Sequence, residues 1–253
     1  MGFWNSISTF SGTTDPIIAH DLKSVVSGKI GHRFEEIQLK IQQNGLLFPL
    51  DVLLVGGTGT GKSSTLNAIF ESTVAKVGDG VDPETMTITS HSLHKYLRFH
   101  DSAGLGDGKA ADYQHAKNIT AKLLETCTAN EQRYGFIDLV IVLLDGGSRD
   151  LGTAFSLLES VVLKSVEPER VIVAINCADI AMKGRHWNVL SAKPEPILRD
   201  FLDEKATSVQ RRIMESTGLS IKRPVYYSAL CNYNLAQLFD HIISHIPKSR
   251  RNI

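Results

Sequence analysis

The sequence has 253 residues, of which 42% are hydrophobic and 21% are charged, a composition that argues against intrinsic disorder and allows a sizeable buried core. Lys and Arg number 27, and Asp and Glu also number 27, which argues against a protein that holds nucleic acid by bulk charge. The three cysteines are widely spaced and form no metal-ligand pattern, so we expect a reducing, cytoplasmic location rather than a disulfide framework.

The N-terminal stretch MGFWNSISTF lacks the basic region of a secretory signal, and no run reaches the ~18–20 apolar residues of a membrane span. It fits the acylation pattern M-G-x-x-x-[ST] through Gly2 and Ser6, but bulky Phe3 and Trp4 follow the glycine. We expect this N-terminal stretch to lie at the periphery of the molecule, with its aromatic residues docked on the domain. One acyl chain would give only a weak peripheral membrane contact.

The first helical pattern begins after Thr13-Thr14-Asp15-Pro16, a capping candidate with proline in the first turn. Apolar residues recur every three or four positions from Ile18 to Ile41. Gly28 and Gly31 interrupt the pattern, so one bent helix or two fit it, and Asn44-Gly45 ends it. We interpret it as a helix packed on the domain flank, with self-association as the alternative.

Residues 51–70 combine a strand, a glycine-rich loop and a helix. The apolar run Val52–Val55 stops at a segment, Gly56–Ser63, that fills the pattern G-x-x-x-x-G-K-[ST] at every position. Such a loop curls its backbone N–H groups around phosphates at a helix N-terminus. Lys62 would lie along the β- and γ-phosphates as a catalytic group, and the Ser63 hydroxyl would bind Mg²⁺. The nucleotide-binding residues predicted here are Gly57, Thr58, Gly59, Thr60, Gly61, Lys62, Ser63 and Ser64.

The remaining chain alternates strands with helices. Strands are predicted from Ile88 and at residues 97–100, 136–144, 170–175 and 225–228, helices at 110–127, 153–164, 195–216 and 234–246, and a loop at 71–90. This alternation predicts an α/β three-layer sandwich, in which helices cover both faces of a mostly parallel sheet. The economical partition is a nucleotide-binding domain at residues 48–253 and an N-terminal helical extension at residues 1–47.

Ligands of such sheets bind at the carboxyl ends of the strands. Asp101 follows the strand at residues 97–100, where its carboxylate would hold the Mg²⁺ that Ser63 binds. The Gly104 backbone N–H would reach the γ-phosphate. In the loop at 71–90, Thr85 is chosen over Thr87 and Thr89 as the hydroxyl that reaches Mg²⁺ only when the triphosphate is present.

A second group of residues follows the last two strands. The Asp179 carboxylate would accept the ring N–H and the exocyclic amino group of guanine, a donor pair that adenine lacks. Asn176 would connect this loop to the phosphate loop and the base. In the last strand end, Ser228-Ala229, the Ala229 backbone N–H would bind the guanine carbonyl oxygen.

The glycine-rich loop and the segments that follow it resemble, in chain order, the five motifs of GTPases of the translation-factor-related class. The run GKSSTLNAIF is similar to Era-like and YfjP-type bacterial GTPases. The ETM stretch ahead of HSLHKYLRFHDSAGLGD resembles immunity-related GTPases and supports Thr85. The resemblance covers roughly residues 48–247. It implies the P-loop GTPase fold, GTP and GDP as ligands and Mg²⁺ as cofactor. The matching segments are Gly56–Ser63, Thr85, Asp101–Gly104, Asn176–Asp179 and Ser228–Leu230.

Four features depart from the family pattern, and in one of them the third motif reads D-S-A-G at residues 101–104 rather than the commoner D-T-P-G. Cys177 stands where the family has lysine, which predicts weaker guanine affinity. Leu105 stands where Ras-like enzymes have the water-positioning glutamine, and Gly59 where potassium-stimulated relatives have asparagine.

The departures shape the functional expectation. We expect a molecular switch that hydrolyses GTP slowly to GDP and phosphate, stimulated by an effector protein or by a homodimer formed through the switch face or the N-terminal helix. The alternatives are a GTP-dependent binding module with negligible hydrolysis, and an ATPase.

Two further groups of polar residues receive structural interpretations. The histidines at positions 91, 94, 100 and 115 are expected to lie on the surface or to pack against strands. The basic residues Lys248, Arg250 and Arg251 are expected to form a solvated tail.

Overall fold

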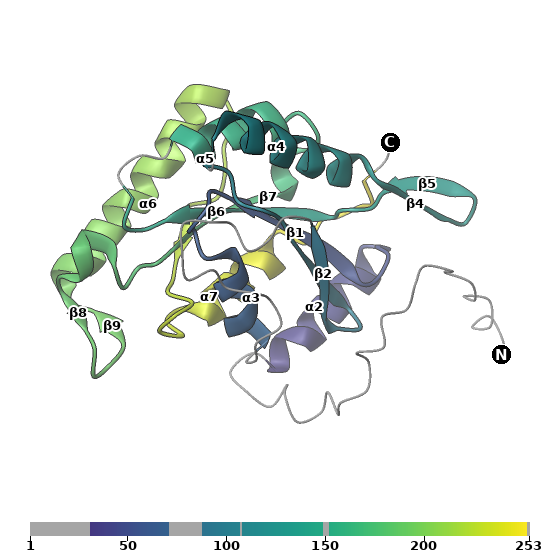
Figure 1. Ribbon diagram of the computed structural model, residues 1–253. Coiled ribbons are helices and arrows are strands. Elements are labelled where there is room, and N and C mark those ends of the chain that lie inside the picture. The colour runs from purple at the N-terminus through teal and green to yellow at the C-terminus, as the bar shows by residue number, and fades with distance from the viewer. Residues whose placement is uncertain (1–30, 71–87, 107, 149–151, 252–253) are drawn as a thin grey trace.

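The computed structural model describes residues 31–70, 88–106, 108–148 and 152–251 (Figure 1). The predicted loop at 71–90 with Thr85 and Thr87, and the N-terminal stretch with Gly2, lie wholly or mainly outside them. The helices are α2 (Gly31–Gln43), α3 (Lys62–Phe70), α4 (Lys109–Leu124), α5 (Gly152–Leu157), α6 (Pro196–Thr217) and α7 (Leu235–Ser244), with shorter helical turns at Leu158–Val162, Pro168–Arg170 and Ala181–Gly184. The strands are β1 (Leu50–Gly56), β2 (Thr89–His94), β3 (Leu97–Asp101), β4 (Thr126–Ala129), β5 (Gln132–Gly135), β6 (Leu139–Asp145), β7 (Val171–Asn176), β8 (Trp187–Asn188), β9 (Lys193–Pro194) and β10 (Val225–Tyr226).

A six-stranded sheet with the order β10-β7-β6-β1-β3-β2 forms the centre of the molecule. All its neighbouring strands run parallel except β2, which pairs antiparallel with β3. The β1 strand lies between β3 and β6, so the glycine-rich loop leaves the sheet in its middle. The predicted α/β fold, with a mostly parallel sheet, is confirmed.

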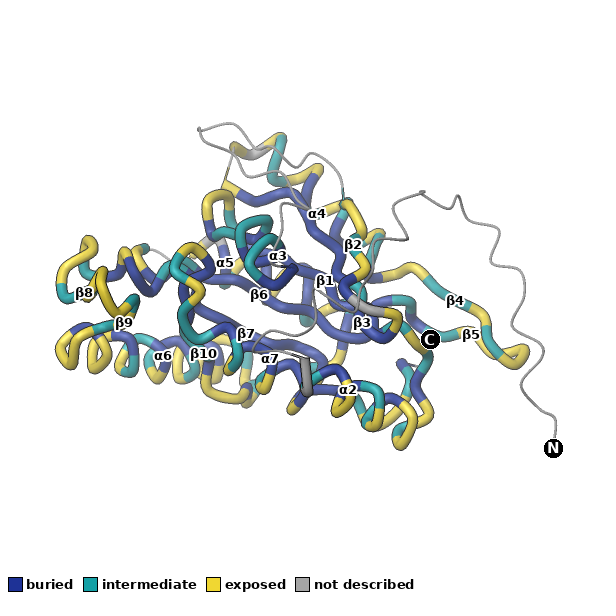
Figure 2. The backbone as a smooth tube through the Cα atoms, turned by 90° about the horizontal axis from the view of Figure 1, so that it is seen from below, coloured by how far each residue is buried: buried dark blue, intermediate teal, exposed yellow. Residues whose placement is uncertain are grey.

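Helices cover both faces of the sheet, because strand residues alternate between two cores. Val52 and Leu54 of β1 pack into one core with α2, α3 and α7, whereas Leu53 and Val55 pack into the other with α4, α5 and α6. Figure 1 shows these two helix layers above and below the sheet, and Figure 2 shows its central strands as buried along nearly their whole length. Strands buried on both faces appear in the sequence as continuous apolar runs.

The helix predicted at residues 110–127 ends early. The α4 helix stops at Leu124, and the chain then forms the β4–β5 hairpin, which the sequence analysis missed. Both turn residues, Asn130 and Glu131, have positive φ angles of 50° and 63°, as the favoured two-residue hairpin turns require. The second position usually carries glycine, and a glutamate there conceals the turn.

The part of the predicted N-terminal helix that is described, α2, packs against α7. Ile37 and Ile41 are fully buried in the core that α7 shares. The Arg33 guanidinium binds the Asp240 carboxylate through Nε at 2.7 Å and Nη2 at 3.0 Å. Within the described residues, no helix is long and apolar enough to cross a membrane.

The segment after α7 is held against the amino ends of the strands. Arg251 is only 5% exposed, and its guanidinium donates to the carbonyl oxygens of Leu123 and Ser165. Its own carbonyl accepts from Gly135 N–H at 2.8 Å. The expectation of a solvated tail is therefore wrong for Arg251, because these carbonyl groups need a buried donor.

Replacing Arg251 with alanine should lower the free energy of unfolding by about 1–3 kcal/mol, because it leaves buried carbonyl groups without a donor. Urea unfolding followed by circular dichroism measures the loss. The exposed Lys248 of the same segment is the matched control, and Lys248→Ala should change stability by less than about 0.5 kcal/mol. Equal effects of the two substitutions would contradict the anchoring role of Arg251.

Candidate functional site

The glycine-rich loop connects β1 to α3. Gly59 and Gly61 have φ angles of +77° and +79°, which favour glycine. A Cβ atom on Gly61 would also collide with the Asn176 side-chain amide. The Lys62 side chain is 7% exposed and turns back over the loop, with Nζ 3.3 Å and 3.1 Å from the carbonyl oxygens of Gly56 and Gly57. The loop thus holds its ammonium group at the predicted phosphate position.

The loop after β3 lies directly against the glycine-rich loop. Thr58 N–H donates to Leu105 O at 2.7 Å, and Leu105 N–H donates to Gly56 O at 3.2 Å. A Cβ atom on Gly104 would lie 2.6 Å from the Thr58 backbone, so only glycine allows this approach. The structure therefore brings the predicted Gly104 beside the predicted phosphate loop.

Ser63 and Asp101, both predicted as metal ligands, are in contact. Ser63 Oγ donates to Asp101 Oδ2 at 2.9 Å. Asp101 is 1% exposed, and its Oδ1 is buried without a hydrogen-bond partner among the described residues. Burial raises the pKa of Asp101, against the hydrogen bond from Ser63 and the nearby Lys62 charge.

This pair fits a magnesium ion. A hydroxyl and a carboxylate oxygen are hard ligands of the kind that Mg²⁺ takes. A buried carboxylate oxygen with no partner is costly, and a cation would satisfy it. The third predicted ligand, Thr85, lies outside the described residues.

The Asn176 side chain connects three loops. Its Nδ2 donates to Thr60 O in the glycine-rich loop at 3.0 Å, and its Oδ1 accepts from Ala229 N–H at 3.0 Å. Its backbone carbonyl accepts from Gly146 N–H at 2.7 Å. The structure thus joins the predicted Asn176, Thr60 and Ala229, and Ala229 N–H already has an acceptor.

Next to this junction, the predicted Ser228 is fully buried, and its Oγ accepts from Cys231 N–H at 3.0 Å. Its hydroxyl therefore shapes the turn after β10. Asp179, 8% exposed, lies in the same loop as Asn176. Between them, Cys177 has a φ angle of 60°. Burial, reinforced by the Asp145 and Asp179 carboxylates, raises the pKa of Cys177 to about 12, so the thiol is protonated at neutral pH.

Sequence reasoning missed two buried contacts that support the site. Thr65 Oγ1 lies 2.7 Å from Gly61 O and 2.8 Å from the hydroxyl of Tyr227, which is fully buried. Lys205 Nζ of α6 donates to the carbonyl oxygens of Asp145, Gly146 and Ser148 at 3.1, 2.6 and 2.6 Å. The sequence did offer a sign of the first contact, because Tyr227 lies in a predicted buried strand and a buried hydroxyl needs a hydrogen-bond partner. The sequence offered no such sign for Lys205, because its hydrogen-bond partners are backbone atoms far away in the sequence.

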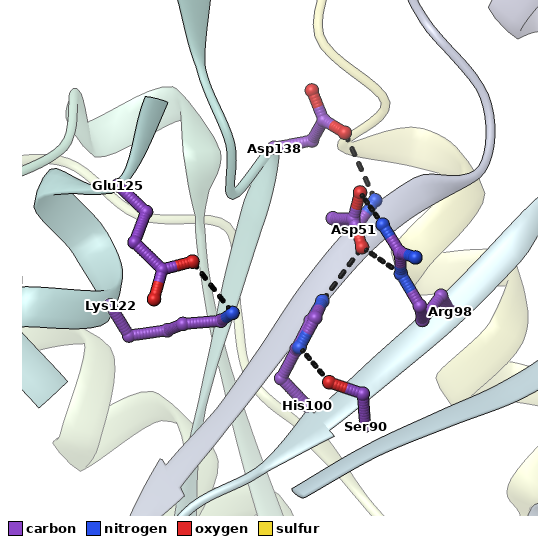
Figure 3. Close-up of polar contacts among 7 residues, drawn as sticks. All are labelled: Asp51, Ser90, Arg98, His100, Lys122, Glu125 and Asp138. Carbon is purple, nitrogen blue, oxygen red and sulfur yellow. Dashed lines mark hydrogen bonds and ion pairs between the residues drawn. The ribbon is translucent and has the colours of Figure 1, made fainter. Parts of the chain in front are cut away.

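A separate polar cluster lies on β1, β2 and β3 and at the start of β6 (Figure 3). Arg98 binds the buried Asp51 through Nε at 2.6 Å and Nη2 at 2.9 Å. His100 Nε2 lies 2.7 Å from Asp51 Oδ1, and its Nδ1 lies 2.8 Å from Ser90 Oγ. Asp51 N–H donates to Asp138 Oδ2 at 2.9 Å. His100 therefore packs within strands, as expected, and positions β3 immediately before Asp101.

Comparison with known families identifies one matching family model, described as "50S ribosome-binding GTPase", over residues 51–177, just over half of the chain. No curated protein matches the sequence. The matched range contains the glycine-rich loop, Asp101, Gly104 and Asn176, and it ends before Asp179.

Solved structures share the fold at low sequence identity. Toc33 from Arabidopsis thaliana, in complex with GDP and Mg²⁺, is 14% identical with a TM-score of 0.60, over 87% of this chain and 93% of that one. Toc33 with Mg²⁺ and GMPPNP is 13% identical with a TM-score of 0.62, over 92% and 98%. Aquifex aeolicus Era bound to GDP·AlF4⁻ is 18% identical with a TM-score of 0.51, over 78% and 56%.

The Asp138 carboxyl should make stability depend on pH. Burial raises its pKa to about 7, whereas an unfolded aspartate has a pKa of about 3.9. The folded state therefore binds more protons between these values, so the stabilisation from this carboxyl is complete below about pH 4 and is lost as pH rises to about 7. Asp138→Asn keeps an acceptor for Asp51 N–H without titrating.

We expect the stability of Asp138→Asn relative to wild type to rise by up to about 1.4 kcal/mol per pH unit between about pH 5 and pH 7. Urea unfolding of both proteins across this range measures the difference. Asp200→Asn, at a carboxylate whose side chain is 73% exposed, is the control and should show no such trend. A pH-independent difference for Asp138→Asn would contradict the raised pKa.

Proposed function

Because the chain belongs to the family of 50S ribosome-binding GTPases, and is therefore a P-loop GTPase, we propose that it acts as a nucleotide-dependent molecular switch that hydrolyses GTP slowly to GDP and phosphate. The observation that carries this proposal is the contact of Ser63 with Asp101 beside Lys62. It provides a cation site and an ammonium group where the phosphates of a nucleotide would lie.

The phosphate-binding roles follow from the loop geometry. We assign the phosphates to the backbone N–H groups and side chains of residues 57–64, with Lys62 beside the β- and γ-phosphates. Ser63 and Asp101 would hold Mg²⁺, joined by Thr85. Bound Mg²⁺ would supply positive charge that neutralises the charge developing on the phosphates. The Gly104 N–H would contact the γ-phosphate and so report its loss.

The base-binding roles are assigned to the loops that Asn176 connects. Asp179 would accept two hydrogen bonds from guanine. Ala229 N–H already donates to Asn176 Oδ1, so its contact with the guanine carbonyl oxygen would be a shared, three-centre hydrogen bond. Ser228 supports that turn through Cys231 N–H. Cys177 offers no long side chain to pack along the base, which supports a lower guanine affinity.

Slow hydrolysis follows from Leu105. Its side chain is 8% exposed and belongs to the core on the α4 face, and a leucine cannot orient the attacking water by hydrogen bonding. Lys62, Thr85 and Gly104 remain as the groups that would contact the reacting phosphate. Leu105 also favours the second candidate, a GTP-dependent binding module with negligible hydrolysis.

Stimulation by a second copy or by an effector protein completes the proposal. Dimerisation is described as important for the GTPase activity of the chloroplast translocon components atToc33 and psToc159. Because the apolar side of α2 is packed against α7, we favour the switch face over the N-terminal helix as the dimer surface. We further propose a GTPase domain at residues 48–253, an extension at 1–47 and a cytoplasmic location, in keeping with the free cysteines at 127, 177 and 231.

Exchanging Asp179 for asparagine should move nucleotide preference from guanosine to xanthosine. GTP affinity should fall by about 100-fold or more, because two hydrogen bonds to a charged acceptor contribute about 1.5–3 kcal/mol each. Competition of GTP, XTP and ATP against a fluorescent GDP analogue in the presence of Mg²⁺ measures the change. Asp200→Asn should behave as wild type. Failure of the wild-type protein to bind GDP or GTP would refute the proposed function, and equal competition by ATP would refute guanine selection.

Turnover in dilute wild-type protein should be slow, on the order of 10⁻⁴–10⁻² s⁻¹ as in switch GTPases without an activator. The turnover number should rise with protein concentration if a second copy stimulates hydrolysis. Phosphate release measured over a range of protein concentrations tests both points, with Lys62→Ala as the inactive reference. Fast turnover in dilute protein would contradict slow intrinsic hydrolysis, whereas no product in a single-turnover assay would favour the binding module.

A further inference from the structure

A small hairpin between the guanine-binding loop and α6 exposes two aliphatic side chains at its tip. The β8 and β9 strands pair through Trp187 with Pro194 and Asn188 with Lys193. Val189 and Leu190, which follow β8, are 82% and 100% exposed. Figures 1 and 2 both show this hairpin projecting at one end of the molecule, beside the start of α6.

Packing contacts hold the base of the hairpin in place, so its tip projects into solvent at a fixed position. The Trp187 ring packs edge-on against Tyr233 with centroids 5.4 Å apart. Trp187 also joins a small core formed by Ala178, Ala181, Leu198 and Leu202. Across the hairpin, Glu195 N–H donates to His186 O at 2.8 Å.

The hairpin is strongly basic within an electrically balanced chain. Residues 182–199 contain four cationic side chains, all exposed, at Lys183, Arg185, Lys193 and Arg199. The only acidic residue in this range is Glu195, whose carboxylate lies 3.1 Å from His186 Nδ1. The segment carries four cations against one carboxylate, and the next residue, Asp200, places a second carboxylate 4.0 Å from Arg199 Nε. Residues 182–200 thus have a net charge of +2, whereas the whole chain has 27 of each sign.

We propose that this hairpin docks on an anionic lipid bilayer, with Val189 and Leu190 entering the headgroup region and the four cations contacting lipid phosphates. Aliphatic side chains flanked by Lys and Arg have the chemistry of a membrane-interface contact. The exposed tip would gain apolar burial there without a shaped partner.

Two other partner classes fit less well. Single-stranded RNA is bound on aromatic platforms where bases stack, but the tip is aliphatic and Trp187 is engaged with Tyr233. A stable protein interface buries about 800 Å² on each partner, which two side chains at a narrow tip do not supply. The bilayer accepts a small apolar wedge and adds its own negative charge.

Co-flotation of the full chain with lipid vesicles tests the proposal. Vesicles of phosphatidylcholine with about 30 mol% phosphatidylglycerol should bind the protein at least about tenfold better than pure phosphatidylcholine, because each nearby Lys or Arg adds attraction to an anionic surface. The double substitution Val189→Ser with Leu190→Ser should reduce binding about tenfold or more through lost apolar burial. Lys183→Gln with Lys193→Gln should reduce binding to anionic vesicles only.

Matched controls distinguish binding through the hairpin tip from nonspecific binding through other exposed apolar side chains. Leu39→Ser with Leu124→Ser removes two aliphatic side chains that are 55% and 63% exposed elsewhere and should leave binding unchanged. Far-ultraviolet circular dichroism and the urea unfolding midpoint of every variant report folding independently of nucleotide hydrolysis. The proposal is overturned if wild type does not float with anionic vesicles, or if the tip variant floats as wild type does. Binding to a mixed-sequence RNA in place of vesicles would assign the cations to nucleic acid and would equally overturn it.

Discussion

The candidate site depends on one side chain, the carboxamide of Asn176. It donates to Thr60 O and accepts from Ala229 N–H, so it fixes the phosphate loop relative to the loops that would select the base. Two glycines make this possible, because side chains on Gly61 or Gly146 would collide with the Asn176 amide or backbone. A buried amide with both functions satisfied is worth more than two isolated contacts, since losing it leaves groups on two loops unpaired. The spacing between the proposed phosphate site and the proposed base site is thus set by an asparagine of the protein itself.

The adjacent residues His100 and Asp101 point to opposite faces of β3 and experience opposite electrostatics. His100 is inserted in a network that satisfies both ring nitrogens, through Asp51 and Ser90. Asp101 is buried, one of its carboxylate oxygens has no hydrogen-bond partner among the residues that the structure describes, and burial raises its pKa. The network thus holds β3 in place, whereas the buried carboxylate of Asp101 is left in an unfavourable electrostatic environment. A cation bound beside Asp101 would offset this cost, so the fold would favour metal binding at the proposed site.

Much of the fold could be predicted from the sequence because its strands are buried on both faces. The runs that became β1, β6 and β7 are continuously apolar, and the glycine pattern marks the turn after β1. The β4–β5 hairpin could not be predicted, because Glu131 adopts a left-handed conformation that sequence patterns reserve for glycine or asparagine. In the candidate site, Ser63 could be inferred from the glycine-rich motif, and Asp101 and Asn176 could be inferred from their positions at strand ends. Lys205 and Arg251 could not, because their acceptors are backbone carbonyls that only the tertiary fold brings near.

The contact between the two ends of the described chain has a consequence for biosynthesis. Arg33 and Asp240 are 207 positions apart, and Arg251 caps the carbonyl groups of Leu123 and Ser165. The core that α2 and α7 share therefore cannot form until translation has reached α7, and until then the apolar side of α2 has no α7 to pack against. Contacts of such long sequence separation form late and slowly. Burial of Ile37 and Ile41 therefore follows the synthesis of α7, and the hydrogen bonds that Arg251 donates form later still.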